Sequence, residues 1–390
     1  MKVASFAPLP PAATGVADYA SALLCALRRF GDATANANDA DVALYHIGNN
    51  HLHRDIYRLA LSRPGVVALH DAVLQHFFLG TLDRDQYVEE FVYNYGEWKR
   101  SLAESLWTNR ARSAADPLYF VYPMLRRLVS ASRAIVVHNP AASSVVLKHN
   151  PSARIIEIPH FFDPPPLPDP IDTLRLRDRL GIGTRTLLVG VFGHLRESKR
   201  LPAIVRVMES LWRSGADAKL LVQGTFASSD LERSLGRYLE NHPHVLRVGF
   251  LNRIEFWKWA AATDVCVNLR FPTAAETSGI AVGMMGIGKA VAFSSGEEID
   301  RIPENACLRV EPGPTEEKIL ADYLGWLSGD REAAIEIGLR AAAYIRREHA
   351  LDKVAAEYWR VLEMAVNYKD ETTASVNSVV PEEPPTSGVR

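Results

Sequence analysis

Short apolar runs alternate with helical patterns along most of this chain, and the alternation limits the possible folds more than any other feature. The runs lie at 3–6, 42–46, 66–70, 134–138 and 154–158 in the first half, and at 187–192, 219–223, 245–248, 264–269, 290–294 and 307–310 in the second. Strands that alternate strictly with helices form parallel sheets covered on both faces. A Pro-rich segment at 161–170 separates the halves and cannot be a helix or a central strand. We therefore predict an α/β protein with two doubly wound domains that face each other across a cleft.

The domain boundaries follow from these patterns. We place an N-terminal domain at 1–163, a stiff Pro-rich linker at 164–170 and a C-terminal domain at 171–348. Residues 349–368 have the pattern of a C-terminal helix, which we expect to pack back on the first domain. Residues 369–390 are polar, contain several prolines and lack aromatic side chains, so we expect a disordered tail.

Bulk composition excludes several classes of function. The net charge of −2 and the pI of about 6.6 give no global basic field, so a nucleic acid is not an expected partner. The three cysteines, Cys25, Cys266 and Cys307, have no paired spacing, and we expect buried thiols in a reducing cytoplasm. No signal peptide or membrane-spanning run is expected. A weak basic patch at 125–133 leaves open a peripheral contact with the inner face of the membrane.

The segment 269–279 ends an apolar run, carries one carboxylate and opens a helical pattern. The first turn of a helix has unpaired N–H groups and partial positive charge, so Thr277, Ser278 and Gly279 can bind a phosphate. Glu276 would repel that phosphate, and a sugar hydroxyl suits it better. The alternative is that Glu276 is a surface residue and Thr277 an ordinary cap.

A second candidate segment follows the run at 187–192. Gly193 is followed by Arg196, Lys199 and Arg200, so three cations share one loop. In the cleft they can neutralise a diphosphate and stabilise it as it leaves. A solvated basic helix start is the alternative interpretation.

The first domain supplies candidates for the opposite wall of the cleft. Gly15 and Asp18 lie where a Pro-rich loop meets the first helix, and His70 and Asp71 end the third run. His138 ends the fourth. A histidine at such a point can bind a sugar hydroxyl, shuttle a proton, or be a structural polar residue. His51 and His53 lack a third ligand, so we predict no metal site, and the motifs of dinucleotide-binding Rossmann sites, P-loops and nucleophile elbows are missing.

Taken in order, several motifs resemble those of the retaining glycosyltransferases with the GT-B fold, the group 1 or family 4-like enzymes. The motifs are the loop at 14–19, the strand end at 66–71, residues 158–160, Gly193 with Lys199, residues 248–251, and 270–279 followed by 288–291. The resemblance covers about residues 1–366. It implies two Rossmann-like domains and a hexosyltransferase that moves a sugar from a nucleotide diphosphate to a hydroxyl, with retention and without a metal or other cofactor. The acceptor would be a glycan, a lipid-linked molecule or a small alcohol, in bacterial polysaccharide or glycoconjugate biosynthesis.

The same resemblance assigns roles to individual residues. Glu276 matches a glutamate that contacts the donor sugar, and Lys199 matches the lysine that binds the diphosphate. Gly249, Phe250 and Leu251 resemble the loop beside the nucleotide base. Gly15 matches a flexible loop near the donor phosphate and acceptor, and His70 a histidine near the transferred sugar.

Two positions depart from the family pattern. Met284 stands where a second glutamate usually binds the ribose, and a thioether cannot replace it. His194 stands where an arginine often follows the glycine of the phosphate loop, so Arg196 or Arg200 must supply the second cation. These departures keep open a nucleotide-sugar-binding protein without catalysis, and a phosphorylase or an epimerase with similar domains is a further alternative. The sequence does not predict an oligomeric state.

Overall fold

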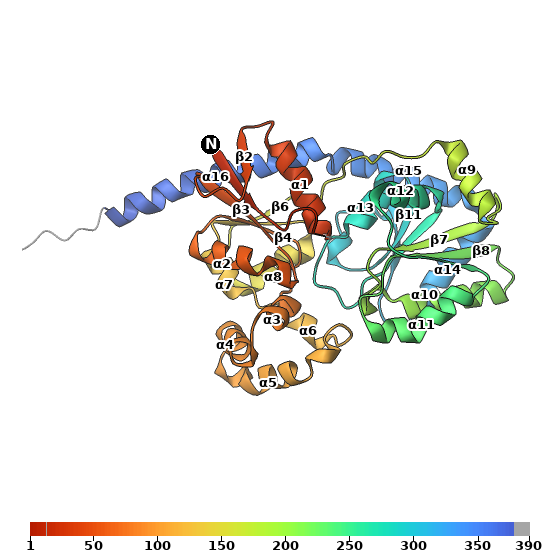
Figure 1. The fold of residues 1–390 in the computed structure, drawn as a ribbon, viewed down its shortest axis with the longest axis horizontal. Coiled ribbons are helices and arrows are strands. Elements are labelled where there is room, and N and C mark those ends of the chain that lie inside the picture. Colours follow the sequence, from red (N-terminus) through yellow and green to blue (C-terminus); the bar gives the residue numbers. More distant parts are fainter. Residues whose placement is uncertain (13, 378–390) are drawn as a thin grey trace, which may run out of the picture.

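A computed structural model describes residues 1–12 and 14–377 of the chain, with side chains as far as residue 367. It contains two six-stranded sheets, each parallel throughout and covered by helices (Figure 1). The two doubly wound domains predicted from the sequence are therefore confirmed. Six short 3₁₀ helices join the main elements: η1 (His51–His53), η2 (Glu97–Lys99), η3 (Arg110–Arg112), η4 (Glu197–Lys199), η5 (Glu297–Ile299) and η6 (Glu304–Ala306).

The first sheet has the strand order β2-β1-β3-β4-β5-β6. Its strands are β1 (Lys2–Phe6), β2 (Asp32–Ala35), β3 (Val42–Ile47), β4 (Val66–Leu69), β5 (Ala134–Val137) and β6 (Ile155–Glu157), and its covering helices include α1 (Gly15–Leu27), α2 (Arg54–Ser62), α7 (Arg126–Ala131) and α8 (Pro140–His149). A helical lobe between β4 and β5 hangs below the sheet in Figure 1. The lobe contains α3 (Gln75–Thr81), α4 (Arg84–Tyr95), α5 (Arg100–Thr108) and α6 (Leu118–Val121).

The second sheet has the order β12-β11-β10-β7-β8-β9. Its strands are β7 (Leu187–Phe192), β8 (Ala218–Gln223), β9 (Val245–Val248), β10 (Val265–Asn268), β11 (Ala290–Ser294) and β12 (Leu308–Val310). Its helices are α9 (Pro170–Arg179), α10 (Leu201–Arg213), α11 (Ser229–Asn241), α12 (Arg253–Ala262), α13 (Gly279–Gly286), α14 (Glu316–Gly329) and α15 (Arg331–Glu348). In both sheets the strand order reverses, between β1 and β3 and between β7 and β10, and such switch points open crevices at the carboxyl ends of the strands.

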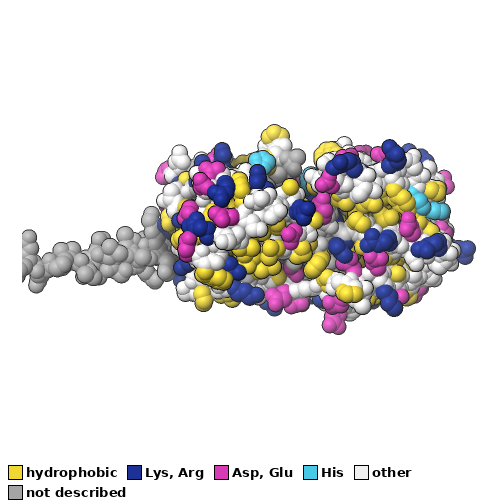
Figure 2. All heavy atoms as spheres, turned by 90° about the horizontal axis from the view of Figure 1, so that it is seen from below, with side chains coloured by type: hydrophobic (Ala, Val, Ile, Leu, Met, Phe, Trp, Pro, Cys, Tyr) yellow, Lys and Arg dark blue, Asp and Glu magenta, His cyan; other side chains and the backbone are white. Residues whose placement is uncertain are grey.

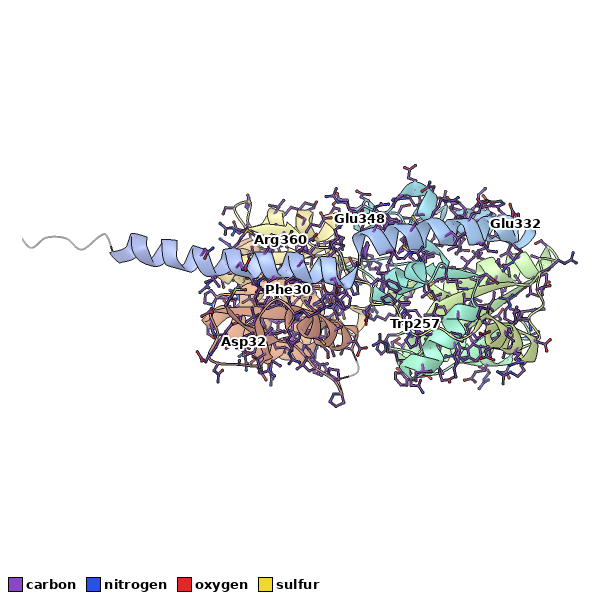
Figure 3. The ribbon with its side chains drawn as sticks, turned by 90° about the horizontal axis from the view of Figure 1, so that it is seen from above. Phe30, Asp32, Trp257, Glu332, Glu348 and Arg360 are labelled. Carbon is purple, nitrogen blue, oxygen red and sulfur yellow. The ribbon has the colours of Figure 1, made fainter. Side chains whose placement is uncertain are left out.

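The last helix, α16 (Leu351–Asn377), crosses back over the first domain, as Figure 3 shows from above. Tyr358 on α16 is fully buried, and its hydroxyl lies 3.2 Å from that of Tyr19 on α1. Where the chain passes between the domains, the N–H of Phe162 donates to the carbonyl of His349 at 2.6 Å, and His349 Nδ1 donates to the carbonyl of His160 at 2.6 Å. The two crossings of the chain therefore run side by side.

Two details of the first domain and one of the tail differ from expectation. The edge strand β2 was not predicted because its sequence, Asp-Ala-Thr-Ala, is short and partly polar. Cys25 is exposed on α1, whereas Cys266 and Cys307 are buried as expected. The helix α16 continues to Asn377, beyond the predicted start of the tail at 369, because no Gly or Pro interrupts it before Pro381. Residues 378–390 of that predicted tail lie outside the described part of the chain.

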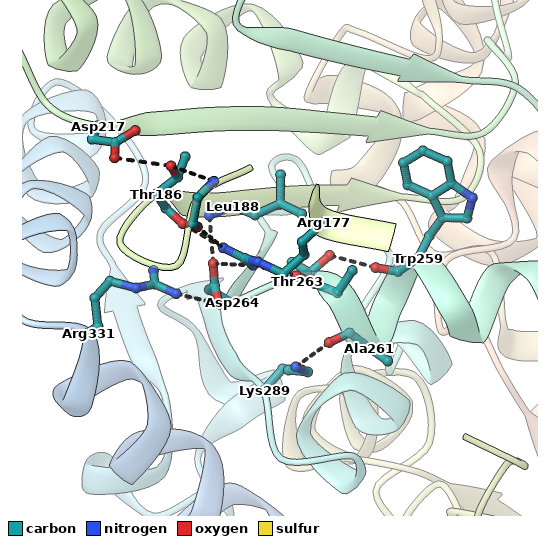
Figure 4. Close-up of polar contacts among 12 residues, drawn as sticks. Arg177, Thr186, Leu188, Asp217, Trp259, Ala261, Thr263, Asp264, Lys289 and Arg331 are labelled. Atoms are coloured by element: carbon teal, nitrogen blue, oxygen red, sulfur yellow. Dashed lines mark hydrogen bonds and ion pairs between the residues drawn. The ribbon is translucent and has the colours of Figure 1, made fainter. Parts of the chain in front are cut away.

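A partly buried charge network ties the second domain together at the amino end of β10 (Figure 4). Arg177 on α9 donates to Asp264 Oδ2 at 3.0 Å and to three backbone carbonyls. The same carboxylate accepts from the N–H of Leu188 at 2.7 Å and pairs with Arg331 on α15. These bonds join two helices to the sheet on the side away from the carboxyl ends of the strands.

Surface charge agrees with the composition. On the face seen in Figure 2, basic and acidic side chains are interspersed. Over the described residues, no helix combines the length and the apolar character needed to cross a membrane.

Candidate functional site

A cavity of about 640 Å³ lies between the domains, at the carboxyl ends of both sheets. Side chains from the two domains line it together. The predicted site residues that line it are Gly15, Asp18, His70, Asp71, Arg196, Lys199, Phe250, Leu251, Glu276, Thr277, Ser278 and Gly279. Segments separated by more than 250 residues thus meet at one place, as expected where the carboxyl ends of strands face each other.

Lys199 and Arg196 form the cationic wall of this cavity. Lys199 is buried at the end of η4, and its Nζ donates to the carbonyl of Phe192. Burial lowers the pKa of Lys199 to about 7, and repulsion from Arg270 and Arg196 adds to the shift. The three cations are therefore close enough to repel one another, and an anionic ligand would reduce this repulsion.

Gly193 shapes the backbone beneath this wall. Its φ is +85°, and a Cβ there would lie 2.5 Å from Ile280 Cδ1 and 3.3 Å from Lys199 Nζ. A larger residue would therefore push directly against the lysine that faces the cavity.

Gly193 and two other predicted donor-site residues, Arg200 and Gly249, do not line the cavity. Arg200 adopts a left-handed conformation, with φ of 60°, and its Nε donates at 2.9 Å to Glu316, a fully buried carboxylate on α14. Of the two arginines considered as the second cation beside Lys199, only Arg196 therefore lines the cavity. The carbonyl of Gly249 accepts from Gln223 Nε2 at 3.0 Å, and only the neighbouring Phe250 and Leu251 border the cavity.

Glu276 is held firmly in its loop. Arg270 Nη1 donates to one carboxylate oxygen at 2.9 Å, and the N–H of Ala274 donates to the other at 2.8 Å. Thr273 Oγ1 also donates, at 3.3 Å. The carboxylate is thus oriented before any ligand arrives, and the oxygen bound by Arg270, which accepts only one of these three bonds, still has a free lone pair for a hydroxyl. Ser278 Oγ caps α13 by accepting from Ala281 at 3.3 Å.

The loop that carries Glu276 also contacts the first domain. The N–H of Ala72 donates to the carbonyl of Ala274 at 2.8 Å. Asn139 Nδ2 lies 2.9 Å from both the carbonyl of Ala275 and Thr277 Oγ1. The loop at 272–277 is therefore a bridge across the interdomain space, and we call it the bridging loop.

His70 and Asp71 lie on the wall formed by the first domain. His70 Nε2 shares a hydrogen bond of 3.0 Å with His46 Nδ1, and burial among other histidines lowers the pKa of His70 well below its usual value. His70 is consequently neutral near pH 7 and suited to hydrogen bonding rather than to acid catalysis. Burial raises the pKa of Asp71 to about 6, and the charge of Glu276 contributes.

His138 and Met284 do not face this cavity. His138 is buried, its Nδ1 donates to the carbonyl of Ile158 at 2.9 Å, and it lines a different, smaller cavity. Met284 is completely buried in the core of the second domain, so it presents no group to the cleft. His194 does line the cavity, with a pKa lowered by burial and by Arg196.

Several residues that shape the site were not predicted. Arg270 follows a strand end within a segment already singled out, so its charge could have been a signal. Asn139 lies next to His138 but makes its contacts only through tertiary structure. Trp257 lines the cavity because Gly283 leaves room for its ring, whose nearest atom would be 2.6 Å from a Cβ. Among the described residues, no three His, Cys, Asp or Glu side chains are placed to hold a metal ion.

Comparisons with known proteins identify the architecture. No family model and no curated protein matches the chain. The chain is similar in structure to the sucrose-phosphate synthase of Thermosynechococcus elongatus, with 16% identity, a TM-score of 0.65 and coverage of 96% of this chain and 100% of that one. It is also similar to HepE of Anabaena in complex with UDP-glucose, with 15% identity, a TM-score of 0.62 and coverage of 93% and 100%. WaaG, described as a glycosyltransferase of lipopolysaccharide biosynthesis, matches with 13% identity, a TM-score of 0.56 and coverage of 90% and 98%. The chain has the GT-B fold. This agreement confirms the fold expected from the resemblance in sequence.

Proposed function

We propose that this protein is a glycosyltransferase that moves a sugar from a nucleotide diphosphate to a hydroxyl acceptor. The observation that carries the proposal is the convergence of Lys199, Arg196 and the preoriented Glu276 on one interdomain cavity. A diphosphate beside the two cations would relieve their mutual repulsion. The carboxylate of Glu276 would contact the uncharged sugar of the donor.

The chemistry that we propose combines this placement with the retention of configuration that the resemblance in sequence implies. The bond between the anomeric carbon and the diphosphate oxygen breaks, and the acceptor oxygen forms a new bond on the same face of the sugar. The diphosphate gains negative charge as it leaves, and Lys199 and Arg196 stabilise that charge without a resident metal. An oxygen of the leaving diphosphate takes the proton of the acceptor hydroxyl. Glu276 accepts hydrogen bonds from the sugar, and His70, neutral at pH 7, is placed to do the same.

The structural neighbours suggest where to begin with substrates. HepE was observed with UDP-glucose and with UDP, so uridine nucleotides are the first donors to test. WaaG acts in lipopolysaccharide biosynthesis, which supports a glycan or lipid-linked acceptor. We include in the proposal a cytoplasmic location with peripheral access to the membrane.

Activity assays on purified variants test this function. A panel of nucleotide sugars is first screened for a rise in melting temperature, because a ligand of the native state stabilises it. Transfer from the best donor is then measured in a mixture of acceptors. We expect Glu276→Gln and Lys199→Ala to abolish transfer while folding normally, and the exposed Glu297→Gln to retain it. Near-parental turnover in Glu276→Gln or Lys199→Ala would refute the assigned roles.

A second candidate function is a nucleotide-sugar-binding protein without turnover. It is favoured by the complete burial of Met284 and by the intramolecular hydrogen bonds of Glu276. Tight donor binding with neither transfer nor donor hydrolysis would establish this alternative. Transfer that requires inorganic phosphate as the acceptor would instead indicate a phosphorylase.

A further inference from the structure

A second cavity, of about 250 Å³, lies on the other side of the bridging loop. Its walls come from both domains. His138 and Pro159 belong to the first, whereas Val282, Ile302 and Tyr344 belong to the second. We call it the rear cavity.

The bridging loop separates the rear cavity from the larger cleft. Arg270, Glu276, Thr277 and Ser278 border both spaces, so one segment forms the common wall. Hydrogen bonds from Ala72 and Asn139 fasten this wall to the first domain. A molecule in the rear cavity would therefore touch the segment that holds Glu276 without occupying the cationic cleft.

The lining of the rear cavity selects for a neutral molecule. Much of the surface is apolar, from side chains such as Val282, Met285, Phe293, Ile299 and Ile302. The main charges are already paired. Arg270 binds Glu276 at 2.9 Å, and Arg301 spans the domains to bind both oxygens of Glu157, at 2.9 and 3.1 Å. An anion would lose its hydration without gaining an unpaired counter-charge, and a cation would meet only Glu298, whose carboxylate is partly exposed to solvent.

A small number of polar groups could orient such a molecule. Asn268, His138 and His349 line the rear cavity, and each buries one polar atom that has no hydrogen-bond partner. Buried polar atoms normally have partners. These atoms lie just beneath the cavity surface, so a ligand with a single hydroxyl or N–H group would become a partner for one of them once a small side-chain rotation exposes it, while the apolar body of the ligand fills the remaining space. Ligand sites of this kind, apolar with a few polar groups, are common between domains.

We propose that the rear cavity is an effector site for a neutral, mainly apolar small molecule that carries one hydrogen-bonding group. Because the ligand contacts both domains and the back of the bridging loop, its binding favours the arrangement in which that loop is fastened to the first domain. This inference does not require the transferase activity. Binding at the rear cavity can be measured on its own.

Indole is a suitable probe because it is neutral, apolar and has one N–H donor. Its dissociation constant is measured by NMR titration of the wild type and of three variants. Val282→Phe and Ile302→Phe fill the cavity from different walls, and Ile335→Phe is the control. Ile335 is 59% exposed and borders neither cavity, so it is a matched control. We expect at least tenfold weaker binding in the two filled variants, no change in the control, and undiminished binding when the cleft is saturated with UDP.

Three results would overturn the proposal. They are no indole binding to the wild type, equal binding to the filled variants, and displacement of indole by UDP. If both filled variants fail to fold, a crystal of the wild type soaked in indole decides the matter, since density must lie between Val282 and Ile302.

Discussion

Replacing Lys199 by methionine should stabilise the protein while weakening its affinity for a diphosphate. The lysine has a pKa of about 7 in the folded chain, against 10.5 for an unperturbed side chain. Each pKa unit corresponds to about 1.4 kcal/mol. Below pH 7 the buried charge therefore costs roughly 5 kcal/mol, and an apolar side chain of similar length removes that cost.

The sign of the pH dependence follows from the lowered pKa. Between pH 7 and pH 10.5 the unfolded chain holds a proton on Lys199 that the folded chain has lost, so the stability of the wild type rises with pH in this window. The advantage of Lys199→Met should be roughly 4 kcal/mol at pH 7 and about 1 kcal/mol at pH 10. The affinity for UDP should fall by about 10- to 100-fold in Lys199→Met, because a charge-assisted hydrogen bond contributes about 1.5–3 kcal/mol.

Urea unfolding at pH 7 and pH 10, with UDP binding by calorimetry, measures both effects. Lys318→Met, at an exposed position, is the control and should change neither quantity. Equal stability of Lys199→Met and the wild type at both pH values would show that the lysine is not desolvated. Unchanged UDP affinity would remove Lys199 from the diphosphate site.

Three further predictions concern single contacts. Arg177→Met should destabilise the second domain by about 2–3 kcal/mol in urea unfolding, because it removes a charge-assisted hydrogen bond from the partly buried Asp264. Asn139→Ala removes both side-chain hydrogen bonds to the bridging loop and should lower kcat at least tenfold, whereas unchanged kcat would mean that the bridge is not needed for transfer. Arg196→Met should weaken UDP binding about tenfold or more, and Arg200→Met should leave the affinity for UDP unchanged. Calorimetry measures both affinities, and a loss of affinity in Arg200→Met alone would contradict this prediction.

Sequence patterns correctly predicted that the residues following the strands would lie together at the cleft. Glu276, Lys199 and Asp71 each follow a strand, and a parallel sheet brings such positions to one edge. Arg200 was predicted in the donor site but does not line the cavity, because its side chain pairs with Glu316 from a left-handed backbone position. The orientation of the Arg200 side chain thus depends on a partner more than 100 residues away in the sequence.

The contacts that join the domains were equally inaccessible to pattern analysis. His138 was predicted on the acceptor side, but its ring belongs to the rear cavity, and the neighbouring Asn139 is the residue that reaches the bridging loop. Periodicity assigns a residue to a strand end without saying which of two spaces its side chain enters. The edge strand β2 was missed for a different reason, since its alternation is too short to be distinguished from a loop.

The paired chain crossings give the two halves of the molecule a common axis. Because the N–H of Phe162 donates to the carbonyl of His349, we expect the outgoing and returning segments to move together, and a relative rotation of the domains to turn about this line. The bridging loop and the Arg301–Glu157 pair are two further contacts between the domains. If the domains open to admit the proposed donor, we expect these two contacts to break and the bond between Phe162 and His349 to persist, so that the two walls of the cleft return to the same relative position on closing.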